Sequence, residues 1–340
     1  AYPNELISPF SMDDGFGIKD IEVFDVGDKR VLLASTIFFD IANNCYNISV
    51  FKTDLKSKGS GFHSVPYFTK WNKIFSSKPC LNLEFQRKNE FSKGNAFNNT
   101  SVGGRIQKLD SSHILLTVGD FQNNGSTLMK LHKYPNSSST FKDLVQNVDT
   151  SYGKVIKVNI ENGESNIFTL GHRNPQGLYI VNDNKVFLTE HGPMGGDEVN
   201  ILYKEKNYGW PLRTFGVDYS YKTNGHKWSG DDSDKTHSIF EKPIFSWVPS
   251  IGISNLIGVT KNMFPNWKNN LLVTSLKKKT VYRLFIEKDS VIMIEEIPFG
   301  ARMRDVIELH DGRFVVMTEH RDESSGLYDC NVFILSNSIF

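Results

Sequence analysis

The sequence predicts an all-β protein, and three observations lead to this class. Aromatic residues make up 12% of the chain, and Gly, Asn and Ser are frequent, a composition typical of short strands joined by many turns. Helical periodicity is weak throughout the chain. A pair of short apolar runs, separated by polar residues, returns five times along the sequence.

Each of these five pairs predicts a β-hairpin. The first member is rich in β-branched residues, and the second ends in a small residue or Thr followed by polar residues. In chain order, the paired runs are 18–23 with 31–34, 105–106 with 114–120, 177–180 with 186–190, 256–259 with 271–274, and 305–309 with 314–318.

The turns within these pairs support the hairpins. The third pair is joined through Asn, Asp and Asn at 182–184, and the fifth through the His-Asp-Gly-Arg turn at 310–313. Residues of this kind favour tight turns because they tolerate unusual backbone angles or bond to their own backbone. The one stretch that favours a helical turn is 141–145.

The repeats begin roughly 50 to 85 residues apart, the range in which repeated sheets form the blades of a β-propeller with long inserted loops. The polar stretch 216–237 predicts one such loop, and long loops on a rigid β scaffold are where binding residues usually lie. No linker of domain length interrupts the pattern. We therefore expect one β-propeller domain over residues 1–340, with five countable blades.

Composition excludes several classes of function. The formal net charge is +1, so the chain lacks the positive field of a nucleic-acid-binding protein, despite the lysine run 277–279. No apolar run reaches the roughly 18 residues of a membrane span. The first residues carry no basic segment followed by an apolar one, so we expect a soluble chain that is mature or trimmed.

The three cysteines leave two interpretations open. Cys45, Cys80 and Cys330 form no CxxC pair, which excludes a zinc ribbon and a thioredoxin-like site. They are either buried free thiols, or Cys45 and Cys80 form a disulfide in an oxidising compartment.

The central part of the chain carries the strongest motifs. Residues 171–177 read GHRNPQG, 190–193 read EHGP, 195–200 read GGDEVN and 207–211 read NYGWP. In order and spacing these resemble signatures of the soluble PQQ-dependent glucose/sorbosone (aldose sugar) dehydrogenases. Further matches to this family are GGR at 103–105, TVGD at 117–120, SLK at 275–277 and RMRDV at 302–306.

The resemblance runs from about residue 15 to the C-terminus, and it implies a six-bladed propeller. Family members begin with an additional blade before the segment that resembles residues 15–20, and this chain has only a short lead-in there. The first blade is therefore expected to be absent. Three explanations are open: the chain is truncated, it closes with five blades, or a second copy or another polypeptide supplies the missing sheet, since unpaired sheet edges favour such pairing.

The resemblance also implies that the chain binds pyrroloquinoline quinone (PQQ). PQQ is a flat o-quinone with three carboxylates, so its site needs converging cations, and the planar fork of Arg suits carboxylates well. In each case the alternative is a solvated surface charge or an ordinary turn residue. The positions that match cofactor-binding residues of the family are Arg173, Asn174, Lys277, Arg302 and Arg304, with His191 placed beside the cofactor by the EHGP match.

Calcium is the second implied ligand. In the family, one ion bridges PQQ to backbone carbonyls of the EHGP turn, here Gly192 and Pro193, which suits a hard cation that prefers oxygen. A second, more structural ion would be held by Glu198, the carbonyl of Tyr208 and Asp218, with Glu241 a weaker candidate. The alternative is that these carboxylates belong to ordinary loops.

Trp247 falls where the family has an aromatic residue close to the cofactor. A Trp beside a Pro in a β protein also serves core packing, so both interpretations stand.

One departure from the family concerns catalysis. A histidine held by an aspartate takes the proton from the sugar C1 hydroxyl in the family, and it lies four residues before the Arg of the Gly-Gly-Arg element. Here that position is Ser101, while the matched aspartate, Asp120, is retained. Serine cannot act as this base without a base of its own. Either the alignment slips here, or His191 or Asp120 takes the proton, or the chain binds a ligand without oxidising it.

Three functions are compatible with these motifs. The expected one is a PQQ- and calcium-dependent aldose dehydrogenase, and the alternative is a non-catalytic propeller that serves as a binding or assembly module. A hydrolase or lactonase on a calcium-bearing propeller fits less well, because the cations suit a tricarboxylate better than a neutral lactone. The resemblance implies a periplasmic or extracellular location.

Overall fold

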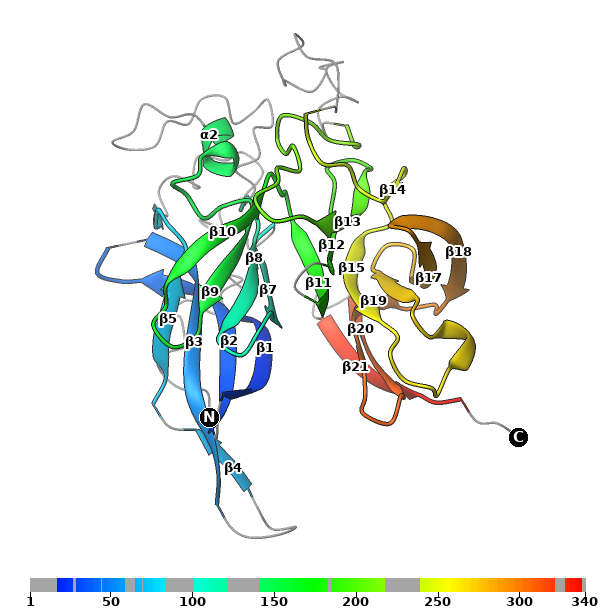
Figure 1. The fold of residues 1–340 in the computed structure, drawn as a ribbon, viewed down its shortest axis with the longest axis horizontal. Helices are drawn as coiled ribbons and strands as arrows, with labels where there is room; N and C mark the ends of the chain where they lie inside the picture. Colours follow the sequence, from blue (N-terminus) through cyan, green and yellow to red (C-terminus); the bar gives the residue numbers. More distant parts are fainter. Residues whose placement is uncertain are drawn as a thin grey trace. The chain divides into compact units, whose positions relative to one another are not determined.

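The computed structural model of the chain describes residues 17–26, 29–43, 45–58, 65–68, 70–82, 101–121, 141–182, 185–217, 239–321 and 328–337. Within these residues the chain forms five β-sheets and little helix (Figure 1). Each predicted hairpin forms a neighbouring strand pair in a different sheet, so all five predicted hairpins are confirmed.

The described residues divide into two compact units. Unit 1 contains the residues up to 175 together with 204–213 and 239–240, and it holds the first two sheets. Unit 2 contains 176–203, 214–217 and the residues from 241 on, and it holds the strands of the other three sheets apart from Pro175.

The first sheet is built around one long strand. Its members are β1 (Gly17–Val26), β2 (Lys29–Asp40), β3 (Cys45–Lys58), β4 (Val65–Phe68), β5 (Asn72–Ser76) and β6 (Leu81–Asn82), and β3 pairs with β2, β4, β5 and β6. Tyr46, Ile48 and Val50 are fully buried and share one face of β3, because successive side chains of a strand point to opposite faces. Asn47 and Ser49 on the opposite face are buried too, so this part of β3 is covered on both faces.

The second sheet packs on the first. Its order is β10-β9-β8-β7, formed by β7 (Gly103–Lys108), β8 (His113–Val118), β9 (Lys154–Asn159) and β10 (Ser165–Leu170). Leu33 and Ile48 of the first sheet share one hydrophobic core with Ile106, Leu116 and Val158 of the second. Burial of this common core holds unit 1 together.

The predicted helical turn is confirmed as α2 (Phe141–Gln146), which lies between the second and third strands of this sheet along the chain. The fully buried ammonium group of Lys154 donates to the carbonyls of Leu144 and Val145 at 3.0 and 2.9 Å. These bonds fix the end of α2 to the start of β9.

Unit 2 contains three sheets, each with its strands in chain order. The third sheet consists of β11 (Pro175–Asn182), β12 (Lys185–Glu190), β13 (Asp197–Leu202) and β14 (Phe245–Trp247). The fourth consists of β15 (Ile253–Gly258), β16 (Leu271–Ser275), β17 (Thr280–Glu287) and β18 (Ser290–Pro298), with the 3-10 turn η5 (Pro265–Trp267) before β16; the fifth consists of β19 (Arg302–Glu308), β20 (Phe314–Arg321) and β21 (Tyr328–Leu335).

The strand β16 is buried on both faces. Leu271 and Val273 pack in a core shared with the third sheet, whereas Leu272 packs in a core shared with the fifth. A strand between two cores cannot alternate apolar and polar residues, which explains the continuous apolar run at 271–273. The three sheets of unit 2 are therefore stacked in series around β16 and its neighbours.

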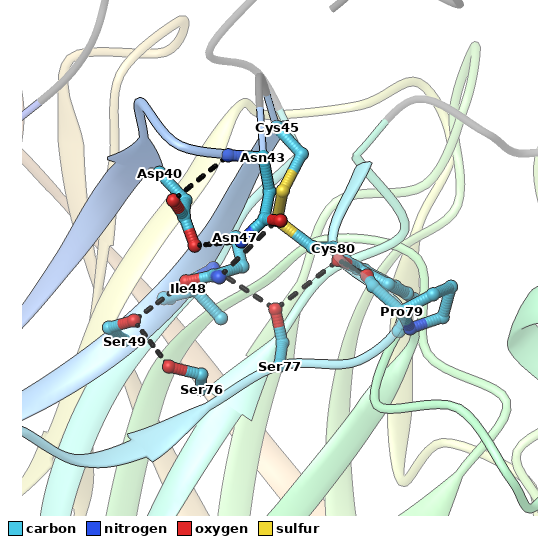
Figure 2. The surroundings of a disulfide bond; sticks show 11 residues. Asp40, Asn43, Cys45, Asn47, Ile48, Ser49, Ser76, Ser77, Pro79 and Cys80 are labelled. Carbon is cyan, nitrogen blue, oxygen red and sulfur yellow. Dashed lines mark hydrogen bonds between the residues drawn. A yellow bond between two sulfur atoms is a disulfide. The ribbon is translucent and has the colours of Figure 1, made fainter. Parts of the chain in front are cut away.

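The disulfide interpretation of the cysteines is confirmed for Cys45 and Cys80, which are bonded to each other (Figure 2). The bond joins the start of β3 to the residue before β6, at the place where β6 pairs with β3. Asn47, which begins a glycan acceptor motif, is buried here and its amide contacts the sulfur of Cys80. Cys330 is free but exposed, so burial was the wrong expectation for that thiol.

Two further expectations from the sequence, a polar loop at 216–237 and the absence of a membrane span, concern residues that the structure describes only in part. The polar loop lies almost wholly outside the described residues, as does Asp218. Among the helices that the structure describes, none is both long and apolar enough to cross a membrane.

Candidate functional site

Ser101, the residue in place of the family's histidine, lies just before β7 in unit 1. Its carbonyl accepts from the N–H of Phe121, and the carbonyl of Val102 accepts from Gly119, each at 2.9 Å. Ser101 therefore lies beside the segment that carries Asp120, as the resemblance implies. Its φ is +60°, in the left-handed region that costs a non-glycine residue about 1 kcal/mol or more and that occurs often at functional sites.

Asp120 is fully buried and is held by two other motif residues. Its Oδ2 accepts from the indole Nε1 of Trp210 at 2.9 Å, and its backbone N–H donates to the carbonyl of Arg173 at 2.9 Å. The guanidinium of Arg173, also buried, lies 5.5 Å from the centre of the Trp210 ring, within cation–π range. Ser101, Asp120 and Arg173 are thus brought together in unit 1.

Trp210 is a further residue of the candidate site, and the sequence alone did not reveal its role. Its signal was the NYGWP motif, whose tryptophan has a ring N–H that a buried site must satisfy. The structure shows that this N–H reaches Asp120, 90 positions earlier in the chain.

The GHRNPQG and NYGWP segments pack against each other in unit 1. The His172 ring is fully buried, accepts or donates a hydrogen bond with the Thr169 hydroxyl at 2.9 Å, and stacks on Tyr208 at 4.8 Å between ring centres. A Cβ on Gly171 would lie 2.2 Å from the side-chain oxygen of Asn207, so only glycine fits there. Asn174 follows Arg173 and is half-buried.

In unit 2, His191 lies beside a buried aspartate. Its Nδ1 is 3.7 Å from Oδ1 of Asp197, which also accepts from the Gly192 N–H at 3.2 Å. The other carboxylate oxygen accepts from the N–H groups of Gly252 and Ile253 at 2.7 and 3.0 Å. Burial acts to raise the pKa of Asp197, but His191, Ser250 and the Ile253 N–H outweigh it, so the pKa is lowered.

Asp197 belongs to the GGDEVN motif, but the sequence alone does not show which residues it contacts. It joins the EHGP turn to the segment before β15, where a Cβ on Gly252 would lie 2.9 Å from the backbone nitrogen of Lys277. A chain of contacts thus runs from His191 through Asp197 and Gly252 to the exposed Lys277.

The EHGP turn is crowded with carbonyl oxygens. A Cβ on Gly192 would lie 2.1 Å from the oxygen of Gly195 and 2.4 Å from that of Gly196, so a side chain cannot be accommodated. Gly192 and Pro193 are both buried. Backbone carbonyls are the kind of ligand that calcium prefers, but these two oxygens belong to Gly195 and Gly196, and a role of the Gly192 and Pro193 carbonyls stays a prediction.

Glu198 is paired across β12 and β13 with Glu190, and Asn200 donates to both carboxylates at 3.1 Å. Burial, followed by repulsion from Glu190, raises the pKa of Glu198 well above its ordinary value. A nearby cation would relieve this repulsion. However, among the residues that the structure describes, no three His, Cys, Asp or Glu side chains are placed to hold a metal ion.

The other predicted ligands of the second calcium ion stay predictions. Tyr208 belongs to unit 1, Glu198 belongs to unit 2, and Asp218 lies outside the described residues. Glu241 is half-buried near Tyr203, whose pKa is raised by burial and by the charges of Asp289 and Glu241.

Trp247 is partly buried and packs against the core that the third and fourth sheets share. It is opposite Asp197 in the β13–β14 pair, and its ring lies 4.7 Å from Phe245 and 5.4 Å from Tyr282. The packing interpretation is therefore confirmed, and a contact with the cofactor stays a prediction.

Arg302 and Arg304 lie together on β19 and share one acidic partner, Glu319 of β20. Arg302 donates from Nε at 2.9 Å and Nη2 at 2.7 Å to one carboxylate oxygen, and Arg304 donates from Nε at 2.9 Å and from Nη2 to the other. The two arginine side chains are 37% and 39% exposed. They offer an accessible pair of cations, as the RMRDV motif predicts.

Known proteins resemble this chain in sequence and in fold. The aldose sugar dehydrogenase YliI of Escherichia coli (strain K12) is 34% identical over 247 residues, which cover 71% of this chain and 61% of that protein. The chain spans 54 to 61% of the length of three curated relatives that it matches.

Two solved structures share the fold. The apo-form of the soluble aldose sugar dehydrogenase from Escherichia coli has a TM-score of 0.68 at 25% identity, covering 95% of this chain and 83% of that one. The PQQ-bound aldose sugar dehydrogenase from Streptomyces coelicolor has a TM-score of 0.63 at 16% identity, covering 94% and 80%. The five sheets are thus the blades of a β-propeller of this type.

The model of one protein family, described as glucose/sorbosone dehydrogenase, matches residues 85–328, which is more than half of the chain. The matched region includes both the Ser101–Asp120–Arg173 group of unit 1 and the arginine pair of unit 2. The chain therefore belongs to the glucose/sorbosone dehydrogenase family.

Proposed function

We propose that this chain is a PQQ- and calcium-dependent aldose dehydrogenase that oxidises the C1 hydroxyl of a sugar. The observation that carries the proposal is the accessible arginine pair on β19, ordered by Glu319 and matching a family motif. Guanidinium groups pair with carboxylates through two parallel hydrogen bonds, so this donor set fits a ligand with several carboxylates.

The residues proposed to bind PQQ are those that match cofactor-binding positions of the family: Arg173, Asn174, His191, Trp247, Lys277, Arg302 and Arg304. When bound, PQQ would supply the o-quinone that accepts a hydride from the sugar. The chain's own residues would hold the carboxylates and orient the sugar.

Calcium is proposed at two places. The carbonyls of Gly192 and Pro193, which match the EHGP turn of the family, are the proposed ligands of the ion next to the cofactor, since backbone oxygens suit a hard cation. Glu198, the carbonyl of Tyr208, Asp218 and Glu241 are the proposed ligands of the structural ion, and the raised pKa of Glu198 supports a cation there.

The proton of the sugar hydroxyl needs a base, and Ser101 cannot supply one. Of the two substitutes, Asp120 is fully buried and bonded to Trp210, whereas the His191 side chain is 20% exposed. Accessibility favours His191 as the group that meets the substrate.

A periplasmic or extracellular location is part of the proposal. The disulfide between Cys45 and Cys80 supports it, because such bonds persist in oxidising compartments.

The second candidate is a non-catalytic propeller that binds a ligand or a partner. The observation in its favour is Ser101 at the position of the family's base. Both candidates have the same fold, but only the dehydrogenase oxidises a sugar, so measurement of aldose turnover distinguishes them.

The test is to titrate the purified chain with PQQ in the presence of calcium by calorimetry, and then to measure dye reduction by aldoses. Binding with turnover is the expected result. Binding without turnover would favour the second candidate, and no binding would overturn the proposal.

A further inference from the structure

Glu319 of β20 contacts both arginines, and it belongs to none of the sequence motifs. Its side chain is 8% exposed, and each of its carboxylate oxygens takes one guanidinium. Burial acts to raise its pKa, but the hydrogen bonds and charges of Arg304 and Arg302 lower it below the ordinary value. Glu319 is therefore a buried, charged centre between two cations.

A β-bulge brings the two arginines to this centre. Met303 is opposite Thr318 and Asp305 is opposite Met317, so Arg304 is an extra residue in β19. The bulge lets both Met303 and Val306 point into the core, although they are three positions apart. Bulges re-aim side chains in this way next to functional sites. Arg302, directly across from Glu319, and Arg304 can then approach the same carboxylate.

The contacts with Glu319 leave the outer edges of both guanidinium groups available. A guanidinium has five N–H donors, and Glu319 takes those on Nε and one of those on Nη2. The Nη1 edge and the second Nη2 hydrogen point away from that contact, and more than a third of each side chain is exposed. Two forks, fixed in orientation, thus face outward.

We propose that Glu319 is the positioning residue of an anion clamp, which holds Arg302 and Arg304 so that their outer edges receive carboxylates of a single polycarboxylate ligand. This inference rests on the proposed function, in which that ligand is PQQ. A carboxylate beside an anion site opposes binding by its charge. Glu319 nevertheless favours binding, because it holds two long side chains in place before the ligand arrives, so that binding does not have to pay their loss of conformational entropy.

The two effects have opposite signs, which makes the test sharp. If charge alone matters, E319Q removes a repulsion and PQQ binds more tightly. If Glu319 positions the arginines, E319Q weakens PQQ binding, by about tenfold, because two flexible side chains must be ordered on binding. E319D, which keeps the charge but is too short to reach both arginines, should weaken binding as well.

E295Q is the matched control. It removes the same charge from another arginine–glutamate pair of unit 2, Arg283 and Glu295, whose Nε–Oε2 distance is 2.5 Å. Calorimetry with PQQ and calcium should give the wild-type affinity for E295Q. Equal or tighter binding by E319Q and E319D would overturn the positioning role.

A readout without ligand separates this inference from the proposed function. In arginine-labelled protein, the Nε–H signals of Arg302 and Arg304, assigned with R302K and R304K, should be protected from exchange in the wild type and lost in E319Q. Unprotected signals in the wild type would overturn the clamp itself. Protected signals without PQQ binding by the wild type would overturn the proposed function and the ligand assigned to the clamp.

Discussion

The indole N–H of Trp210 donates to the carboxylate of Asp120 across 2.9 Å, and both side chains are buried. The aspartate that the family pattern pairs with a histidine is thus bound by a tryptophan in this chain. Since the same ring lies against the guanidinium of Arg173, one side chain orients both a proposed catalytic carboxylate and a proposed cofactor contact.

W210F should lower the free energy of unfolding by about 2 kcal/mol, because a buried carboxylate loses a hydrogen-bond donor while the aromatic packing is largely kept. Urea denaturation measures this change. In a D120L background the same W210F substitution should cost less, since the acceptor is gone. An equal cost in both backgrounds would show that packing, not the hydrogen bond, is lost.

S101H should increase aldose oxidation by about a hundredfold or more, the usual contribution of a positioned general base. The backbone at this position favours the exchange, because His is one of the residues enriched at positive φ. Dye reduction in the presence of PQQ and calcium measures the gain. S101N tolerates the same backbone but carries no base, and activity in S101N equal to that in S101H would contradict the assignment.

Removal of the Cys45–Cys80 bond should lower the free energy of unfolding by about 4 kcal/mol, the loop-closure value for a separation of 35 residues. The double variant C45S/C80S and reduced wild-type protein should agree in urea denaturation. C330S, at the exposed free thiol, should unfold like the wild type.

E22Q should raise the stability at alkaline pH and leave it unchanged in acid. Burial, and then the charge of Asp20, raises the pKa of Glu22 to about 7. A carboxyl whose pKa is raised by folding contributes stability below its ordinary value, and this contribution is lost as the pH rises through about 7. Thermal melts at about pH 8 and about pH 4 test the sign, and equal shifts at both would contradict it.

Calcium should raise the melting temperature of the wild type, and a chelator should reverse the increase. The raised pKa of Glu198, buried beside Glu190, indicates a repulsion that a bound cation relieves. E198Q should lose the calcium-dependent increase, whereas E295Q, which changes a carboxylate whose side chain is 46% exposed, should keep it. A full calcium response in E198Q would remove Glu198 from the proposed site.

Much of the fold could be predicted because its signals are local. Each hairpin is specified by two short apolar runs and a turn, and the five predicted hairpins and the helical turn at 141–145 are all present. The strands β4, β5 and β6 were not predicted, because no pair of apolar runs marks them. They pair with different parts of the long strand β3. That residues 1–340 form one domain stays a prediction.

The candidate site was harder to predict, because its contacts join positions far apart in the chain. Motif matches identified Asp120, Arg302 and Arg304, but their partners are far away in the chain. Trp210 reaches Asp120 only once two loops are packed. Glu319 lies across from Arg302 by the register of β19 and β20, and Arg304 joins them as the extra residue of a bulge. Local sequence patterns contain neither fact.

The bulge at Arg304 has an evolutionary consequence. Met303 and Val306 face the same core although they are three positions apart, because Arg304 is an extra residue between them. Deleting Arg304 would leave them two positions apart in a regular strand, so both would still face the core. Folding therefore does not require the bulge, and lineages that lost the anion ligand would be expected to lose the extra residue as well.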